Sequence, residues 1–199
     1  MKEKTFDEKM LEILSLYTSN YEAKIHLREI TRKIKTDTKT ASLNLKKLLE
    51  LKVLKSAKIG KHKEFFLNNE NIVSKYFLII TEIYKSFTFL STHFKIFKIF
   101  EMLEELADGI IIFGSYAKNI ATKESDLDLL IINGNIESKR MEAENLYGIK
   151  ISPKYFSTKE FIRAQKVKDI LFIEVLSSHI ILKGFELFVN TTWRNYYGF

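Results

Sequence analysis

The residues of this chain that can do chemistry by type and spacing lie close together in the sequence. Asp126 and Asp128 stand two positions apart, and an apolar run from 129 to 132 follows them. In a strand, side chains two positions apart point to the same face of the sheet. Two carboxylates on one face repel each other unless a cation lies between them, and Mg²⁺ prefers oxygen ligands, including phosphate oxygens. The pair therefore predicts a magnesium site that also receives phosphate.

A glycine and a serine precede the two aspartates and complete the predicted site. Gly114 and Ser115 follow a short apolar run, 109–113, which is typical of a buried strand. Gly114 would let a phosphate approach the backbone, and Ser115 could donate its hydroxyl and its amide to that phosphate. A helical turn over 116–122 then leads to the aspartates. This order of elements predicts a nucleotide site at the mouth of a sheet.

The segments GSYAKN and SDLDLL resemble the signature of the DNA polymerase β-like nucleotidyltransferase superfamily, in particular its minimal nucleotidyltransferases. The resemblance covers residues 93–190. It implies that Asp126 and Asp128 bind Mg²⁺ and are catalytic, while Gly114 and Ser115 hold the β- and γ-phosphates of a nucleoside triphosphate, with ATP the first candidate. The implied activity is transfer of a nucleoside monophosphate to an acceptor hydroxyl on a protein or a nucleic acid.

The sequence departs from the family pattern at two places. Asn119 stands where the family usually has Gly, but Asn tolerates left-handed backbone, so the turn can survive. Active members also carry a third carboxylate on a later strand, which we expect here over 147–152. The active face of that strand holds Lys150 and Ser152 and no acid. Either the third carboxylate comes from elsewhere or catalysis is weakened or lost, and Lys150 could contact a triphosphate instead.

The positive charge of the chain is concentrated near its start. The net charge is +7, and residues 1–68 hold 16 Lys and Arg against 9 Asp and Glu, whereas the remaining residues hold 16 of each. Within 24–63 the count is 13 against 3. A basic first third on a neutral remainder suggests two modules, the first with a polyanionic partner. A lysine-rich solubilising surface would give the same charge.

The first 70 residues have the pattern of three helices and a hairpin. Apolar residues recur at helical spacing over 6–17, 26–34 and 38–51, and two short strand-like runs follow at 53–59 and 62–67. This order resembles a winged helix-turn-helix domain, which implies binding to double-stranded DNA. A winged helix that contacts only proteins is the alternative.

On the DNA-binding interpretation, the third helix enters the major groove and the hairpin contacts the backbone. The residues expected to face bases are Thr40, Ser42, Asn44 and Lys46. Those expected to contact phosphates or the neighbouring groove are Lys39, Lys47, Lys61, His62 and Lys63.

Residues 71–106 carry almost no turn signals and predict one long kinked helix or two consecutive helices. Ser91 or Thr92 is the expected cap at the break. Aromatic side chains there exceed what one helix face needs to cover a neighbour. A homodimer interface and packing against the flanking domains are both consistent with this excess.

The predicted fold class is α+β. A winged helix-turn-helix over 1–70 is followed by a helical connector over 71–106 and by a nucleotidyltransferase-like mixed sheet flanked by helices over 107–199. After Pro153 the chain is expected to be helical.

Composition excludes several classes of protein. The absence of Cys excludes disulfides and thiolate metal sites, and the four scattered His do not predict a structural zinc site. The longest stretch without charged residues is nine residues, far short of the ~20 of a membrane-spanning helix. The charged start lacks a signal-peptide core. We expect a cytoplasmic protein of prokaryotic type with no membrane partner.

Three functions remain open on the sequence. The first is a DNA-binding nucleotidyltransferase, whose family resemblance implies an antitoxin that modifies a HEPN-type toxin and represses its own promoter. The second is a winged-helix transcriptional regulator whose nucleotidyltransferase domain only binds a nucleotide or a partner, as the missing third carboxylate would allow. The third is an adaptor that uses both folds as scaffolds.

Overall fold

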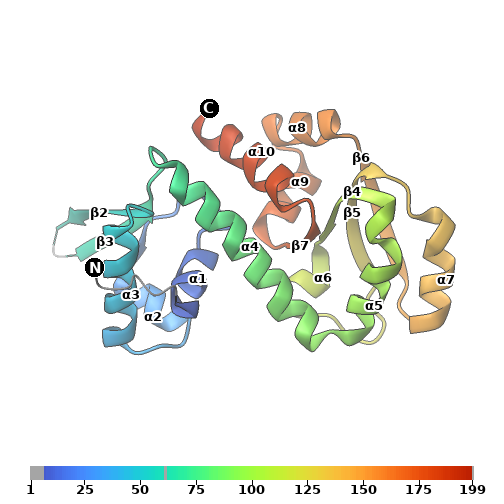
Figure 1. Cartoon of the computed structure of the whole chain (residues 1–199), viewed down its shortest axis with the longest axis horizontal. Coiled ribbons are helices and arrows are strands. Elements are labelled where there is room, and N and C mark those ends of the chain that lie inside the picture. Colours follow the sequence, from blue (N-terminus) through green and yellow to red (C-terminus); the bar gives the residue numbers. More distant parts are fainter. Residues whose placement is uncertain (1–6, 61, 199) are drawn as a thin grey trace. The chain divides into compact units, whose positions relative to one another are not determined.

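The computed structural model describes residues 7–60 and 62–198 (Figure 1). The chain divides into two compact units. The first runs up to Thr81 and includes the end of the chain from Tyr196, and the second comprises Glu82–Asn195. The predictions made for Phe6 and Lys61 fall outside the described residues. None of the helices in the described part of the chain has the length and apolar run that crossing a bilayer requires.

The first unit has the arrangement of a winged helix, as predicted. Its helices are α1 (Glu8–Ser15), α2 (Leu27–Lys33) and α3 (Thr38–Glu50). Its strands are β1 (Ile25–His26), β2 (Leu54–Ile59) and β3 (His62–Leu67), which form an antiparallel sheet in the order β1-β3-β2. The two-residue strand β1 was not predicted, because so short a run has no periodicity of its own.

Local chemistry fixes where these helices begin and what they bury. α3 begins after Asp37, whose carboxylate accepts a hydrogen bond from the Thr40 amide at 2.9 Å, as an N-cap residue does. The predicted apolar stripes are buried against one another, with Leu14, Ile30 and Leu48 fully enclosed.

Two consecutive helices follow the hairpin, one of the two predicted arrangements. They are α4 (Ile72–Thr92) and α5 (Phe94–Leu103), and a 3-10 turn, η1 (Glu104–Leu106), ends the segment. The predicted cap at Ser91 or Thr92 is wrong, since His93 occupies the cap position of α5. Both hydroxyls instead bond back to carbonyls of α4, Ser91 to Thr88 at 2.8 Å and Thr92 to Phe89 at 3.0 Å.

The second unit is built on a mixed sheet, as predicted, and this sheet has four strands. The strands β4 (Ala107–Ile112), β5 (Leu127–Gly134), β6 (Ile151–Phe156) and β7 (Ile180–Lys183) lie in the order β6-β5-β4-β7. β5 is antiparallel to β4 and parallel to β6, and β7 is antiparallel to β4.

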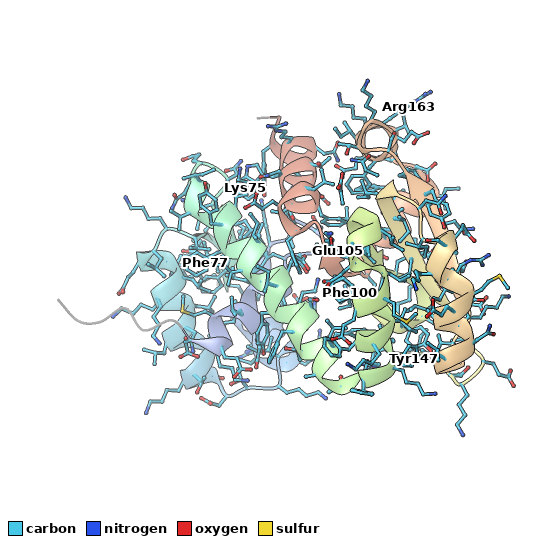
Figure 2. All side chains as sticks on the ribbon, turned by 45° about the vertical axis from the view of Figure 1, so that its right-hand side comes forward. Lys75, Phe77, Phe100, Glu105, Tyr147 and Arg163 are labelled. Atoms are coloured by element: carbon cyan, nitrogen blue, oxygen red, sulfur yellow. The ribbon has the colours of Figure 1, made fainter. Side chains whose placement is uncertain are left out.

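Helices cover both faces of this sheet (Figure 1). One face packs against α5 and α7 (Glu137–Tyr147), whose side chains include Phe100 and Tyr147 (Figure 2). The other face packs against α8 (Thr158–Lys166), α9 (Ile170–Ser177) and α10 (Phe185–Tyr197). Along β5, Leu129 and Ile131 enter the first core while Leu130 and Ile132 enter the second. The sheet is therefore apolar on both sides except at its ends.

The strand expected over 147–152 lies four residues later than predicted. α7 continues to Tyr147, and Gly148 ends it in the left-handed conformation with φ of +65°. The strand β6 begins only at Ile151 and includes Pro153, where we had expected the chain to turn helical. β6 is an edge strand, where the missing amide of a proline is tolerated.

A buried charged cluster connects α4 to the sheet within the second unit. The Glu82 carboxylate accepts from His179 Nε2 at 2.9 Å and from the Lys85 ammonium at 2.8 Å. His179 Nδ1 lies 3.0 Å from the Val175 carbonyl. Burial by itself would raise the pKa of Glu82, but the Lys85 and His179 charges outweigh it and hold that pKa well below its usual range.

We expect Glu82→Ala to lower the free energy of unfolding by about 3–5 kcal/mol, because it leaves Lys85 and the buried His179 without their carboxylate partner. Since the folded-state pKa of Glu82 is depressed, its contribution is complete above the ordinary pKa near 4.5 and is lost as the pH falls below it. Urea unfolding at neutral and acid pH measures both effects.

Glu101→Ala is the matched control for this experiment, because Glu101 pairs with Lys98 at 2.7 Å on the surface of α5. Its loss is expected to change the unfolding free energy by less than ~1 kcal/mol. Equal effects of the two substitutions would contradict a structural role for the buried cluster.

Candidate functional site

The turn between β4 and β5 is shaped by the close approach of Gly114 and Asp128. Gly114 begins the short helix α6 (Gly114–Ala117) with φ of +66°, a conformation that favours glycine. A Cβ at position 114 would overlap the Asp128 carboxylate. The Phe113 amide donates to the Asp128 carbonyl at 3.1 Å, which fixes the two segments side by side. Position 114 therefore requires glycine for two independent reasons.

The two predicted carboxylates lie at the start of β5. Leu127 and Leu129 are buried in the core, as expected, while Asp126 and Asp128 are half-exposed. Burial is the main cause that raises the pKa of Asp128, and the negative charges of Asp126 and Glu174 raise it further. The fold thus holds negative charges close enough to oppose one another.

Strand β6 supplies a hydroxyl and positive charge to this face but no acid. Ser152 stands beside Asp128 in the parallel register and donates its hydroxyl to that carboxylate. Lys154, two residues on, lowers the pKa of Asp128 by its charge. The predicted strand was misplaced, yet the corrected β6 still carries no Asp or Glu on this face.

Lys150, predicted to contact a triphosphate, lies next to the aspartates. The Leu127 amide donates to the Lys150 carbonyl at 2.7 Å, which brings Lys150 beside the start of β5. Its ammonium lies 3.4 Å from Asp126 Oδ2 while most of the side chain stays exposed. A cation therefore already faces the Asp126 carboxylate.

Two residues that were not predicted join this region in the fold. Glu174 of α9 is near enough for its charge to raise the pKa of Asp128. Lys118, at the end of α6, pairs with Glu174 at 2.9 Å. Lys118 lies within the motif GSYAKN, so the sequence offered a signal for it. Nothing in the sequence points to Glu174, which is distant in the chain and belongs to an ordinary helical pattern. Asn119 takes the left-handed conformation expected of it, with φ of +56°.

The residues at this site fit a magnesium ion whose shell is completed by other ligands. Among the described residues there is no group of three or more His, Cys, Asp or Glu that could hold a metal. Mg²⁺ is commonly held by one or two carboxylates together with substrate phosphates and water. Asp126 and Asp128 provide two carboxylates, and the glycine beside them leaves no side chain in the way.

A second candidate site lies on the first unit, between α2, α3 and the hairpin. It is a hollow of about 1010 Å³. The predicted residues Ser42, Lys46, His62 and Lys63 line it, and so do Arg28, Arg32 and His26, which the sequence analysis did not single out. Arg28 and Arg32 are four positions apart on α2, so they project from the same face of that helix. This spacing was a signal available in the sequence.

One of the predicted DNA contacts needs correction, and two others already have partners within the chain. Asn44 is buried, because positions 41, 44, 45 and 48 form the inward stripe of α3, and its amide donates to the Thr40 carbonyl at 3.1 Å. Lys47 is half-buried and pairs with Asp7 at 3.2 Å, so it is not an exposed cation. The Thr40 hydroxyl donates to Asp37 at 2.6 Å.

The other predicted DNA contacts in the described residues are exposed: Lys39, Ser42, Lys46, His62 and Lys63.

Residues 95–181 match the family model described as a nucleotidyltransferase domain. A curated protein from Methanocaldococcus jannaschii, described as a putative protein adenylyltransferase, is 31% identical over 99 residues, which cover 44% of this chain and 63% of that protein. The chain thus spans less than two thirds of this relative. The predicted nucleotidyltransferase domain is confirmed.

A solved winged helix-turn-helix domain from Mycobacterium bovis, described as homodimeric, DNA-binding and from a possible ArsR-family transcriptional regulator, is 19% identical with a TM-score of 0.33. The matched region covers 39% of this chain and 68% of the solved chain. The winged-helix fold of the first unit rests on its element order and sheet, not on this likeness.

We expect Gly114→Ala to abolish nucleotide binding and to destabilise the fold, because the methyl group would displace the Asp128 carboxylate. Gly148→Ala is the matched control: Gly148 has φ of +65° but nothing within 4 Å of the added methyl. The control variant should lose only about 1–2 kcal/mol of unfolding free energy, from backbone strain, and should still bind the nucleotide. Calorimetric titration of Mg²⁺-ATP and urea unfolding measure the two effects, and equal behaviour of both variants would contradict the role of Gly114.

Proposed function

We propose that this chain transfers a nucleoside monophosphate from a magnesium-bound nucleoside triphosphate to a hydroxyl group of another macromolecule. The observation that carries the proposal is the contact of Gly114 with Asp128, with Asp126 alongside, inside the segment that matches the nucleotidyltransferase family model. This arrangement leaves an open backbone for phosphate beside two carboxylates that can hold a cation.

Each residue of the site has a role in this proposal. Asp126 and Asp128 would hold Mg²⁺, which supplies positive charge to the phosphates when bound. Gly114 and Ser115 would seat the terminal phosphates through the backbone amide and the hydroxyl. Lys150, paired with Asp126 before substrate binds, would turn its exposed ammonium toward the triphosphate.

The nucleotide and acceptor follow from the relative and from the family resemblance. The Methanocaldococcus protein is described as a putative protein adenylyltransferase, which favours ATP as donor and a protein hydroxyl as acceptor. The minimal nucleotidyltransferases that the motif resembles make a HEPN-type toxin the first acceptor to test. In that setting the winged helix would regulate the promoter of its own gene.

A second candidate function is regulation without catalysis. The observation that favours it is β6, where Ser152 and Lys154 occupy the face on which active family members carry their third carboxylate. The second unit would then bind a nucleotide and influence DNA binding by the first. Binding of ATP without release of pyrophosphate would favour this function over transfer.

Double-stranded DNA is the proposed partner of the first unit. Arg28, Arg32, Lys46 and Lys63 surround the hollow beside α3, and Glu29 is the acidic residue among its lining. Glu29 pairs with Lys33 at 2.9 Å, so its charge is already compensated. Cations around a concave surface with small polar side chains on a helix are suited to phosphates and base edges.

We expect Asp126→Asn and Asp128→Asn each to reduce the transfer rate by at least about 10³-fold, because several kcal/mol of electrostatic stabilisation are lost. Release of pyrophosphate from ATP, with a candidate acceptor present, measures the rate. Asp169→Asn serves as the control, since Asp169 caps α9 instead of facing the aspartate pair.

Stability separates this loss from unfolding. The raised pKa of Asp128 means that the fold disfavours its ionised form, so its charge reduces stability at neutral pH. Asp128→Asn should therefore keep or slightly raise the thermal midpoint, on a scale of about 2–4 °C per kcal/mol. Unchanged transfer in both aspartate variants would exclude the proposed site.

We expect the double substitution Arg28→Ala with Arg32→Ala to weaken DNA binding at least ~10-fold. It should also lower the slope of log affinity against log salt concentration by about 2, because each lost phosphate contact lowers that slope by about one unit. The matched control is Arg163→Ala with Arg194→Ala, which removes two exposed arginines from the second unit (Figure 2 labels Arg163). Fluorescence anisotropy with duplex DNA at several salt concentrations gives both quantities. DNA binding that does not depend on salt concentration would exclude the hollow as the DNA surface. An equal loss of affinity in the two double variants would exclude it as well.

A further inference from the structure

The outward face of α4 is apolar along four turns. Six large side chains on this helix are exposed by between 37% and 72%: Ile72, Val73, Tyr76, Ile80, Ile83 and Phe87. Single exposed apolar residues are common on protein surfaces, but a continuous row of this size on one helix marks an interaction surface.

The inward face of the same helix buries an unusual number of polar side chains. Ser74, Thr81, Glu82 and Ser86 are buried beside Leu78, and Phe89 and Leu90 near the end of the helix pack against the core of the sheet. A surface helix normally buries its apolar stripe and exposes its polar residues. The apolar row left exposed on α4 is therefore the feature to explain.

The outward face carries almost no charge. Among the residues of α4, Lys75, Glu82 and Lys85 are the charged ones, and Glu82 and Lys85 pair with each other at 2.8 Å. Lys75 is half-buried and lies 6.0 Å from the centre of the Tyr76 ring (Figure 2 labels Lys75). Two copies of this face can meet without charge repulsion, although the chain as a whole has a net charge of +7.

The spacing of the row matches that of a helix that pairs with a copy of itself. Val73, Tyr76, Ile80, Ile83 and Phe87 alternate steps of three and four residues, the heptad pattern by which helices supercoil about one another. We propose that the outward face of α4 is a homodimer interface, in which it packs against the same face of a second copy of this chain.

The exposed area reaches the lower limit for a specific dimer. Large aromatic side chains bury about 150–250 Å² each and the four aliphatic ones less, so full coverage of the exposed fractions would bury at most roughly 600 Å² per copy. Two copies would bury at most about 1,200 Å², the lower end of the range for stable interfaces. An isologous contact of this kind also closes the assembly at two copies.

Sedimentation equilibrium of the full chain, without DNA or nucleotide, tests the interface independently of the proposed function. We expect a dimer, and we expect Ile80→Glu with Ile83→Glu to weaken it by at least ~100-fold, because the charges would be buried in an apolar contact. Met141→Glu with Leu146→Glu is the matched control, since these two exposed apolar residues lie on α7. The control should remain a dimer.

A second measurement does not depend on the glutamate variants folding. The chain contains no Cys, so Ile80→Cys introduces one thiol, at the middle of the row. Because position 80 is central, it meets its own copy whether the two helices run parallel or antiparallel. Mild oxidation should give a disulfide-linked dimer, whereas Met141→Cys should not. The proposal would be overturned if the chain is a monomer at every concentration, if the two glutamate substitutions do not weaken the dimer, or if position 80 gives no cross-link.

Discussion

The close approach of Gly114 to Asp128 is the constraint on which the candidate site depends. The carboxylate of Asp128 lies where any other residue at position 114 would place its Cβ. The antiparallel pairing of β4 with β5, and the hydrogen bond from the Phe113 amide to the Asp128 carbonyl, bring the two halves of the motif together. The sheet thereby joins a phosphate-accessible turn and two carboxylates that the sequence separates.

Charge is used in two different ways in the second unit. At the mouth of the sheet, Asp126 and Asp128 are only half-buried, and the lysines near them keep exposed side chains. In the proposed function, such charges would exchange their partners for a cation and a triphosphate. In the other cluster, Glu82 and His179 are buried and bonded to each other, and the partly exposed Lys85 pairs with Glu82, so these contacts hold α4 against the sheet. Accessibility, rather than the presence of ionisable groups, separates the candidate site from the structural cluster.

Helix α4 belongs to both units and exposes a row of large apolar side chains. Four of its polar residues are buried, while six of its large apolar residues are exposed. A helix stabilised only by its own chain would gain more free energy from the opposite arrangement, since burial of apolar surface is the main favourable contribution. In the proposed homodimer, α4 would join two copies of the proposed DNA surface and two copies of the proposed nucleotide site.

The sequence by itself determined the features that depend on neighbours in the chain: the three helices and hairpin, the Gly-Ser turn, and the shared face of Asp126 and Asp128. Turn chemistry, helical spacing and strand alternation are local, so a motif such as SDLDLL already contains them. Tertiary structure decided the rest. The rotation of α3 about its axis buries Asn44, because packing fits that stripe against the core in spite of one polar side chain. Gly148 lets α7 extend and moves the next strand to Ile151. Glu174 comes near Asp128 only because α9 packs on the sheet, a long-range contact that residue spacing does not encode.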